Sequence, residues 1–115
     1  EKFNEIVQRT KEGGAEIGKL LEKSSAYYAP AASGIEIAES YLKNQKKLLP
    51  CAAYLSGEYG VKNLYAGVPV IIGSAGVEKI EELSLNIEEK KQFEKSINAV
   101  NNLWLSACKI DPELK

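Results

Sequence analysis

The sequence predicts an α+β fold in which helices pack on a small antiparallel sheet and a long helix follows it. Apolar residues recur every three or four positions over residues 1–23, 28–46 and 86–111, the period of amphipathic helices. Residues 48–85 instead contain short apolar, β-branched runs separated by glycine-rich turns, which favours strands. Two helices, a block of strands and a last helix indicate an α+β class.

The first helix contains a Gly13-Gly14 pair in its interior. Each glycine costs roughly 1 kcal/mol relative to alanine there, so we expect a bend or the close approach of another backbone. The alternative, a glycine cradle for phosphate, is disfavoured because no strand precedes the pair and no helix begins at it.

The second helix, predicted over residues 28–46, begins among small side chains. Residues 29–34 read Ala-Pro-Ala-Ala-Ser-Gly, too small to fill a core. Pro30 suits a first helical turn, because its missing N–H would have no partner there in any case. Glu36 and Glu39 lie early and lysines late, as the helix dipole favours.

The middle of the chain predicts a meander of two or three antiparallel strands. Residues 48–56 and 64–73 are the first two, and residues 73–76, Gly-Ser-Ala-Gly, form a turn. Residues 77–85 are ambiguous between a helix and a strand that closes a hairpin. Pro69 within the second run suggests an edge strand or a bulge.

The last helix has the clearest signals. Asn86 can cap its start and Glu89 can reach back to the cap, while Pro112 stops it. We expect Trp104 to lie in the core or a subunit interface. The stripe at helical spacing comprises Phe93, Ile97, Val100, Trp104 and Ala107 or Cys108.

Composition excludes several kinds of chemistry. The net charge of −1 gives no basic face for nucleic acid or acidic membranes. The absence of histidine removes the commonest acid–base group and, without a close cysteine pair, a zinc site. Arg9 is the only arginine, so no arginine pair can clamp a dicarboxylate. No apolar run approaches the roughly 20 residues of a membrane span, and no signal-peptide pattern opens the chain.

The remaining reactive residues predict nothing catalytic. Cys51 and Cys108 are expected to be buried, reduced thiols of a cytosolic protein, and Cys51 follows a proline in an inert apolar run. Acidic residues between 78 and 89 alternate with lysines, as on a solvated face. The absence of methionine suggests a piece of a longer chain.

One tract carries a specific resemblance. Residues 57–61, Gly-Glu-Tyr-Gly-Val, are followed by Gly67-Val68-Pro69 and then by Gly73. Residues 49–100 resemble the C-terminal half of a malate dehydrogenase of the bacterial, lactate-dehydrogenase-like branch. Residues 6–42 are similar to the helical stretch that precedes it in that family, so the resemblance covers essentially the whole chain.

The resemblance implies that residues 1–115 are the C-terminal, substrate domain. The NAD-binding domain, the catalytic histidine and the substrate-binding arginines of the family would lie upstream, so no catalytic or metal residue is assigned here. By the same resemblance, Ala26, Tyr28, Ala29 and Pro30 are expected to form a wall facing nicotinamide and substrate. Plain helix packing is the alternative explanation for these four residues.

The implied function is reversible oxidation of (S)-malate to oxaloacetate with NAD by a cytoplasmic, homodimeric or homotetrameric parent enzyme of the tricarboxylic acid cycle. Its partners would be malate or oxaloacetate, NAD, its own N-terminal domain and further copies, with no nucleic acid and no membrane. The chain alone is expected to be inactive and to bind no NAD. A lactate or other 2-hydroxy-acid dehydrogenase is one alternative, and a non-catalytic interaction domain is another.

Overall fold

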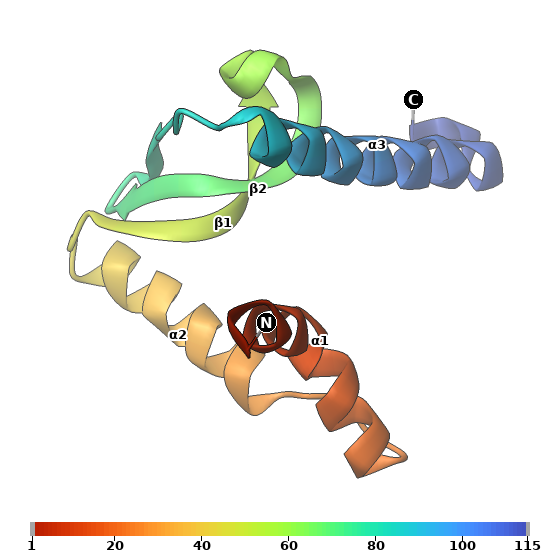
Figure 1. Cartoon of the computed structure of the whole chain (residues 1–115). Helices are drawn as coiled ribbons and strands as arrows, with labels where there is room; N and C mark the ends of the chain where they lie inside the picture. The colour runs from red at the N-terminus through yellow and green to blue at the C-terminus, as the bar shows by residue number, and fades with distance from the viewer. Residues whose placement is uncertain (1, 115) are drawn as a thin grey trace. The chain divides into compact units, whose positions relative to one another are not determined.

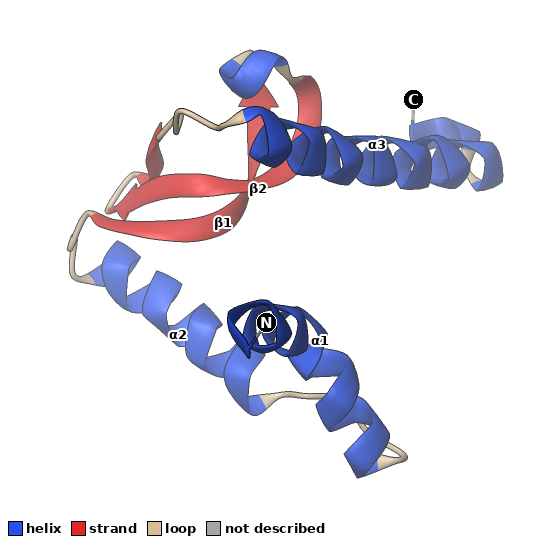
Figure 2. Ribbon diagram, in the orientation of Figure 1, coloured by secondary structure: helices blue, strands red, loops and turns tan. Residues whose placement is uncertain are grey.

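The computed structural model describes residues 2–114. These contain α1 (Lys2–Leu21), α2 (Tyr28–Leu42), β1 (Lys47–Ser56), the short 3-10 turn η1 (Glu58–Gly60), β2 (Lys62–Gly73), β3 (Gly76–Ile80), α3 (Ile87–Ile110) and the 3-10 turn η2 (Pro112–Leu114) (Figures 1 and 2). The order of elements confirms the α+β class. The chain divides into two compact units, one ending at Ala38 and one beginning at Glu39.

The first unit consists of α1 and most of α2. No residue of α1 is buried within the described part of the chain, although the helix is amphipathic. The helix continues through Gly13 and Gly14, and no atom lies within 4 Å of where a Cβ would stand on either. The expected close approach of another backbone at these glycines is therefore wrong for residues 2–114.

Helix α2 ends at Leu42, four residues before the predicted end at Lys46. Asn44 and Lys46 have φ angles of 48° and 53°, in the left-handed region, which a helix cannot include. The lysines after Leu42 suggested a longer helix with positive charge at its end. Their spacing does not indicate that the backbone reverses at residues 44–46. The turn delivers Lys47 directly into β1.

The three strands form an antiparallel sheet in the order β1-β2-β3, which confirms the meander. The ambiguous segment 77–85 divides: its first part is strand β3, and residues 81–86 form no regular element. Side chains alternate along β1 and β2, so that one face of the sheet carries the core. Its buried residues are Ala53, Leu55, Ala66, Val68, Val70 and Ile72.

Pro69 lies on the central strand, so the expectation of an edge strand is wrong. It is matched with Pro50 across β1–β2, a pair in which neither residue has an N–H to donate. The carbonyl of Pro69 accepts the Glu81 N–H at 2.9 Å, so its backbone polar side faces away from β1. The β2–β3 ladder has an irregularity, but it falls between Ile71 and Ile72.

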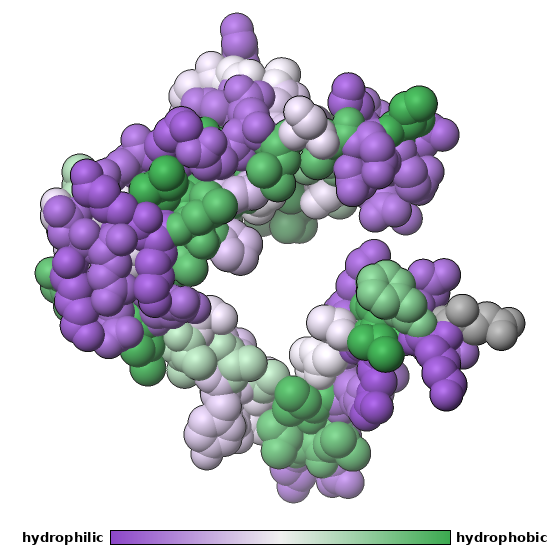
Figure 3. Space-filling view, turned by 60° about the vertical axis from the view of Figure 1, so that its left-hand side comes forward, coloured by the Kyte–Doolittle hydropathy of each residue, from purple (hydrophilic) through white to green (hydrophobic). Residues whose placement is uncertain are grey.

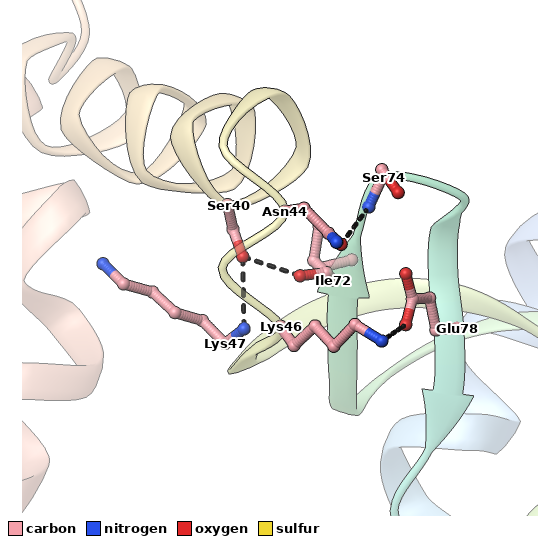
Figure 4. A network of polar contacts seen from close by, with 7 residues as sticks. All are labelled: Ser40, Asn44, Lys46, Lys47, Ile72, Ser74 and Glu78. Carbon is pink, nitrogen blue, oxygen red and sulfur yellow. Dashed lines mark hydrogen bonds and ion pairs between the residues drawn. The ribbon is translucent and has the colours of Figure 1, made fainter.

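Polar contacts tie the end of α2 to the β2–β3 hairpin within the second unit (Figure 4). Ser40, fully buried, donates through Oγ to the Ile72 carbonyl at 2.7 Å and accepts the Lys47 N–H at 3.2 Å. Asn44 Oδ1 accepts the Ser74 N–H at 3.0 Å. We call the two hydrogen bonds of Ser40 the Ser40 latch.

Gly73 lies beside these contacts, where a larger residue would displace neighbouring side chains. A Cβ there would stand 2.1 Å from Glu78 Oε1 and 2.9 Å from Asn44 Oδ1. The same Glu78 pairs through Oε2 with Lys46 Nζ at 3.4 Å. A larger residue at this position of the predicted turn would therefore move the Glu78 carboxylate and the Asn44 amide from their contacts.

Helix α3 begins with the predicted capping box. Asn86 Oδ1 accepts the Glu89 N–H at 2.9 Å, and Glu89 Oε2 accepts the Asn86 N–H at 2.8 Å. The helix packs against β2, buries Cys108 and ends before Pro112. Trp104 is 44% exposed. Both cysteines are free thiols; Cys108 is buried, as expected, whereas Cys51 is only half-buried, and burial raises the pKa of its thiol.

Candidate functional site

A hollow of about 340 Å³ lies between the end of α1 and the beginning of α2, within the first unit. The segment between the helices reverses the chain, with Glu22 at a φ of 55°. Its lining is apolar or aromatic apart from the tyrosine hydroxyls and consists of Ile17, Leu21, Ala26, Tyr27, Tyr28 and Ala29. No charged side chain lines it, so the hollow suits a flat apolar group better than an anion.

Two tyrosines, Tyr27 and Tyr28, line this hollow. Their rings meet edge to face, with centroids 5.6 Å apart. Ser24 Oγ lies 3.0 Å from the Tyr27 hydroxyl and donates to it, which orients that ring. Tyr28 is 87% exposed and is therefore free to contact another molecule.

The first turn of α2 contributes Tyr28 and Ala29 to the lining of the hollow. The Ala31 N–H donates to the Tyr27 carbonyl at 2.9 Å, which starts the helix one residue before Tyr28. Pro30 occupies the first turn, where no N–H is needed, as predicted from its position. Ala29 adds only a methyl group, so the helix backbone stays close to the open space.

The hollow gathers three of the four predicted wall residues. Ala26, Tyr28 and Ala29 line it, whereas Pro30 is not among its lining residues. Tyr27, Ile17 and Leu21 were missed by sequence reasoning. The adjacent Tyr-Tyr pair was a usable signal for Tyr27, but the contribution of α1 depends on the turn that joins the helices. Whether these residues face nicotinamide and substrate stays a prediction.

Arg9 has a structural partner on its own helix. Its guanidinium forms a bidentate pair with the Glu16 carboxylate, at 2.7 and 3.0 Å. Hydrogen bonding and charge attraction between them raise the pKa of Arg9 and lower the pKa of Glu16. The only arginine of the chain is thus paired within α1 and does not line the hollow.

Residues 2–114 contain no cluster of metal-ligating side chains. No group of three or more cysteine, aspartate or glutamate side chains in that range could hold a metal ion.

None of the described helices is both long and apolar enough to cross a membrane. Figure 3 nevertheless shows apolar side chains at the surface among the hydrophilic ones.

Comparison with known proteins identifies the fold. The family described as lactate/malate dehydrogenase, alpha/beta C-terminal domain, matches residues 1–103. The chain belongs to this family. The resemblance inferred from residues 49–100 is thereby confirmed, and so is the C-terminal-domain fold.

Some relatives of the chain are named malate dehydrogenase and others lactate dehydrogenase. A malate dehydrogenase of Pelagibacter ubique (strain HTCC1062) is 66% identical over 99% of this chain and 36% of its own length. The structure of the malate dehydrogenase from Salinibacter ruber is 43% identical, with a TM-score of 0.92, over 99% of this chain and 37% of that one. The lactate dehydrogenase from Eimeria maxima, solved with NADH and oxamate, is 47% identical with a TM-score of 0.91, over 96% of this chain and 34% of that one.

The share of each relative that is covered matters for function. The chain spans only about a third of the length of these dehydrogenases. Their names therefore describe proteins that are much longer than this chain of 115 residues. The family and fold of this chain are shown, and the activity of the intact protein is a separate question.

Proposed function

We propose that residues 1–115 are the substrate domain of an NAD-dependent malate dehydrogenase. The intact protein would reversibly oxidise (S)-malate to oxaloacetate, with the NAD-binding domain in another part of its sequence. The observation that carries the proposal is the 66% identity, over 99% of this chain, to a malate dehydrogenase. The matched length extends through both units, including the segment that forms the hollow.

The hollow at the start of α2 fits one part of NAD. Its apolar lining, which includes the small side chains of Ala26 and Ala29, would accept the face of a flat ring such as nicotinamide. It has no charged or phosphate-binding group, and the chain has no glycine-rich turn between a strand and a helix. The phosphates would therefore be held elsewhere in the intact protein, and this chain alone would bind no NAD.

The role of this chain in the reaction would be to position and to exclude water. NAD, when bound, supplies the hydride acceptor, and the protein supplies orientation and electrostatics. Ala26, Tyr28, Ala29 and Pro30 would provide an apolar wall beside the reacting groups. Proton transfer and recognition of the two carboxylates would fall to residues outside this chain, because it has no histidine and its one arginine does not line the hollow.

The assay is NADH formation by the intact protein with (S)-malate and, separately, with (S)-lactate. We expect turnover of malate and little of lactate. Ala29→Leu should lower kcat/KM for malate at least tenfold, about 1.4 kcal/mol of transition-state stabilisation, because the larger side chain enters the hollow. Ala32→Leu, at an exposed position of the same helix outside the hollow, should leave kcat/KM nearly unchanged.

The two parts of this proposal fail separately. A protein that forms no NADH with malate would overturn the function. An active protein in which Ala29→Leu and Ala32→Leu behave alike would overturn the wall alone.

A lactate dehydrogenase is the second candidate. It is favoured by the Eimeria maxima enzyme, whose chain is 47% identical and whose fold matches with a TM-score of 0.91. The higher identity to a malate dehydrogenase places it second. Preferential turnover of lactate in the same assay would reverse this order.

We further propose that the intact enzyme is cytoplasmic, works in the tricarboxylic acid cycle and assembles as a homodimer or homotetramer. Two free thiols support a reducing compartment. Large exposed apolar residues on α3, among them Leu103, Trp104 and Ile110, support assembly. Sedimentation of the intact enzyme tests the oligomer, and a monomer at all concentrations would contradict it.

A further inference from the structure

Pro69 leaves a gap in the hydrogen bonding of the sheet where β3 ends. In the register of β2 and β3, Val70 pairs with Ile80, so Pro69 lies opposite Glu81. The Glu81 N–H donates to the Pro69 carbonyl at 2.9 Å. An antiparallel pair of this kind normally exchanges two hydrogen bonds, but Pro69 has no N–H to return. The Glu81 carbonyl therefore needs a donor from elsewhere.

Tyr59 supplies that donor. Its hydroxyl donates to the Glu81 carbonyl at 2.7 Å and accepts the Leu83 N–H at 2.9 Å. The side chain thus takes the place of the missing backbone donor and also binds the chain two residues further on. Both contacts join segments separated by more than 20 residues in the sequence.

Other contacts of Tyr59 reinforce this placement. Its backbone N–H donates to the Glu82 carboxylate, and its ring lies against Phe93 of α3 with centroids 5.0 Å apart. Its φ of 53° is in the left-handed region, which is uncommon for an aromatic residue. The strained backbone therefore belongs to Tyr59, the residue that contacts α3 as well as the segment that follows β3.

The segment held in this way has few other anchors. Residues 81–86 belong to no helix or strand, and Leu83 is 55% exposed. A cavity of about 430 Å³ adjoins them, lined by residues of the segment together with Tyr59, Lys90, Phe93 and Glu94. The segment therefore spans a space instead of packing on a core, and we call residues 81–85 the strap.

We propose that Tyr59 is a pin that closes the strap over the beginning of α3, and that the strap opens as a local unit when the pin is lost. The β-sheet stays intact during this opening, because its core pairs lie in β1 and β2. Segments with few buried contacts are the ones that open below the global unfolding free energy. Opening would uncover Phe93 and the cavity beside it.

The test is hydrogen exchange of the intact protein, followed by mass spectrometry of peptides that cover residues 81–86 and 64–73. Tyr59→Phe keeps the ring but removes the donor and the acceptor. We expect exchange at the strap to accelerate about tenfold or more, because two polar groups lose their partners. Exchange within β2 should change less than about threefold.

Two further variants make the test specific. Tyr54→Phe is the matched control, because it also removes a hydroxyl hydrogen bond, to Asn63 Oδ1 at 3.1 Å, but none to the strap. It should leave strap exchange unchanged. Pro69→Ala in the Tyr59→Phe background restores an N–H opposite the Glu81 carbonyl and should recover part of the lost protection, because the Leu83 N–H still lacks its acceptor.

The outcomes separate cleanly. Faster exchange at the strap in Tyr59→Phe alone, with partial recovery in the double variant, supports the pin. Equal acceleration in Tyr54→Phe, acceleration spread over β2, or no change in Tyr59→Phe would overturn it. If Tyr59→Phe does not fold, the double variant should fold, and its failure to do so would also overturn the proposal.

Discussion

Replacing Ser40 by alanine should destabilise the second unit by about 2 kcal/mol. Ser40 has no exposed surface, and its hydroxyl makes one donated and one accepted hydrogen bond. Alanine removes both and leaves the Ile72 carbonyl and the Lys47 N–H without this partner in a buried place. Each buried polar group that loses its partner costs about 1–3 kcal/mol.

One opposing effect must be subtracted from this cost. Alanine is a better helix former than serine by up to about 0.7 kcal/mol, and Ser40 lies in α2. Ser33→Ala carries the same gain on the same helix. Its hydroxyl, which is exposed, bonds only to the Ala29 carbonyl one turn earlier, at 3.1 Å. The difference between the two variants therefore isolates the Ser40 latch.

Urea unfolding of the intact protein measures this difference. At an unchanged m-value, Ser40→Ala should lower the midpoint, while Ser33→Ala should leave it unchanged or raise it slightly. Equal midpoints for the two variants would show that the latch adds nothing to stability. A change in m for Ser40→Ala alone would mean that the two-state assumption, and hence the predicted cost, does not hold.

Two further substitutions address other parts of the second unit. Asn86→Ala removes the capping box of α3 and should cost about 1 kcal/mol in urea unfolding, whereas Asn101→Ala, exposed in the middle of α3, should not. Glu58 accepts hydrogen bonds from its own N–H and from the Ser56 N–H, which lower its pKa. Its contribution to stability is full above the ordinary glutamate pKa of about 4.3 and is lost as the pH falls through the lowered value, so wild type and Glu58→Gln should differ in midpoint at neutral pH and converge in acid. An unchanged difference at low pH would refute the role of Glu58.

The sequence was sufficient wherever a structural element depends on near neighbours. The capping box joins residues three apart, and the two start signals of α2 and α3 are equally local. The hairpin at Gly73 to Gly76 follows from turn residues in the same way. Short-range chemistry of this kind can be inferred from residue types alone.

Long-range partners explain what the sequence did not reveal. A serine in the last turn of a helix gives no sign that it will be buried against a carbonyl 32 residues away. Pro69 suggested a sheet edge, because the rule assumes that a proline on a central strand leaves an acceptor unpaired. The Tyr59 hydroxyl, which is not part of the strand ladder, donates to the Glu81 carbonyl that the proline would leave unpaired. Nothing in the position of Tyr59 in the sequence reveals this contact.

The hollow was predictable only in part for the same reason. Ala26, Tyr28 and Ala29 lie close together in the sequence, so one run of small and aromatic residues pointed to them. Ile17 and Leu21 enter through the reversal at Glu22, whose left-handed φ no residue pattern indicated. The resemblance to a family indicated the side of the hollow that begins at Ala26. Only the structure shows that α1 forms the other side.

Side-chain size distinguishes two kinds of exposed surface in the first unit. Helix α1 exposes large apolar residues, including Phe3, Ile6 and Leu20, and buries none of its side chains in the described part of the chain. An amphipathic helix gains stability only when such a stripe is covered, so these residues are suited to contact other protein. The start of α2 instead exposes alanine, serine and glycine, whose burial would stabilise little because they have little apolar area. A surface built from residues that gain so little from being covered, beside an apolar hollow with two tyrosines, is better suited to a small flat ligand than to a protein partner. Under the proposed function, the remainder of the enzyme would cover the stripe of α1, and the small-residue start of α2 would stay open to nicotinamide and malate.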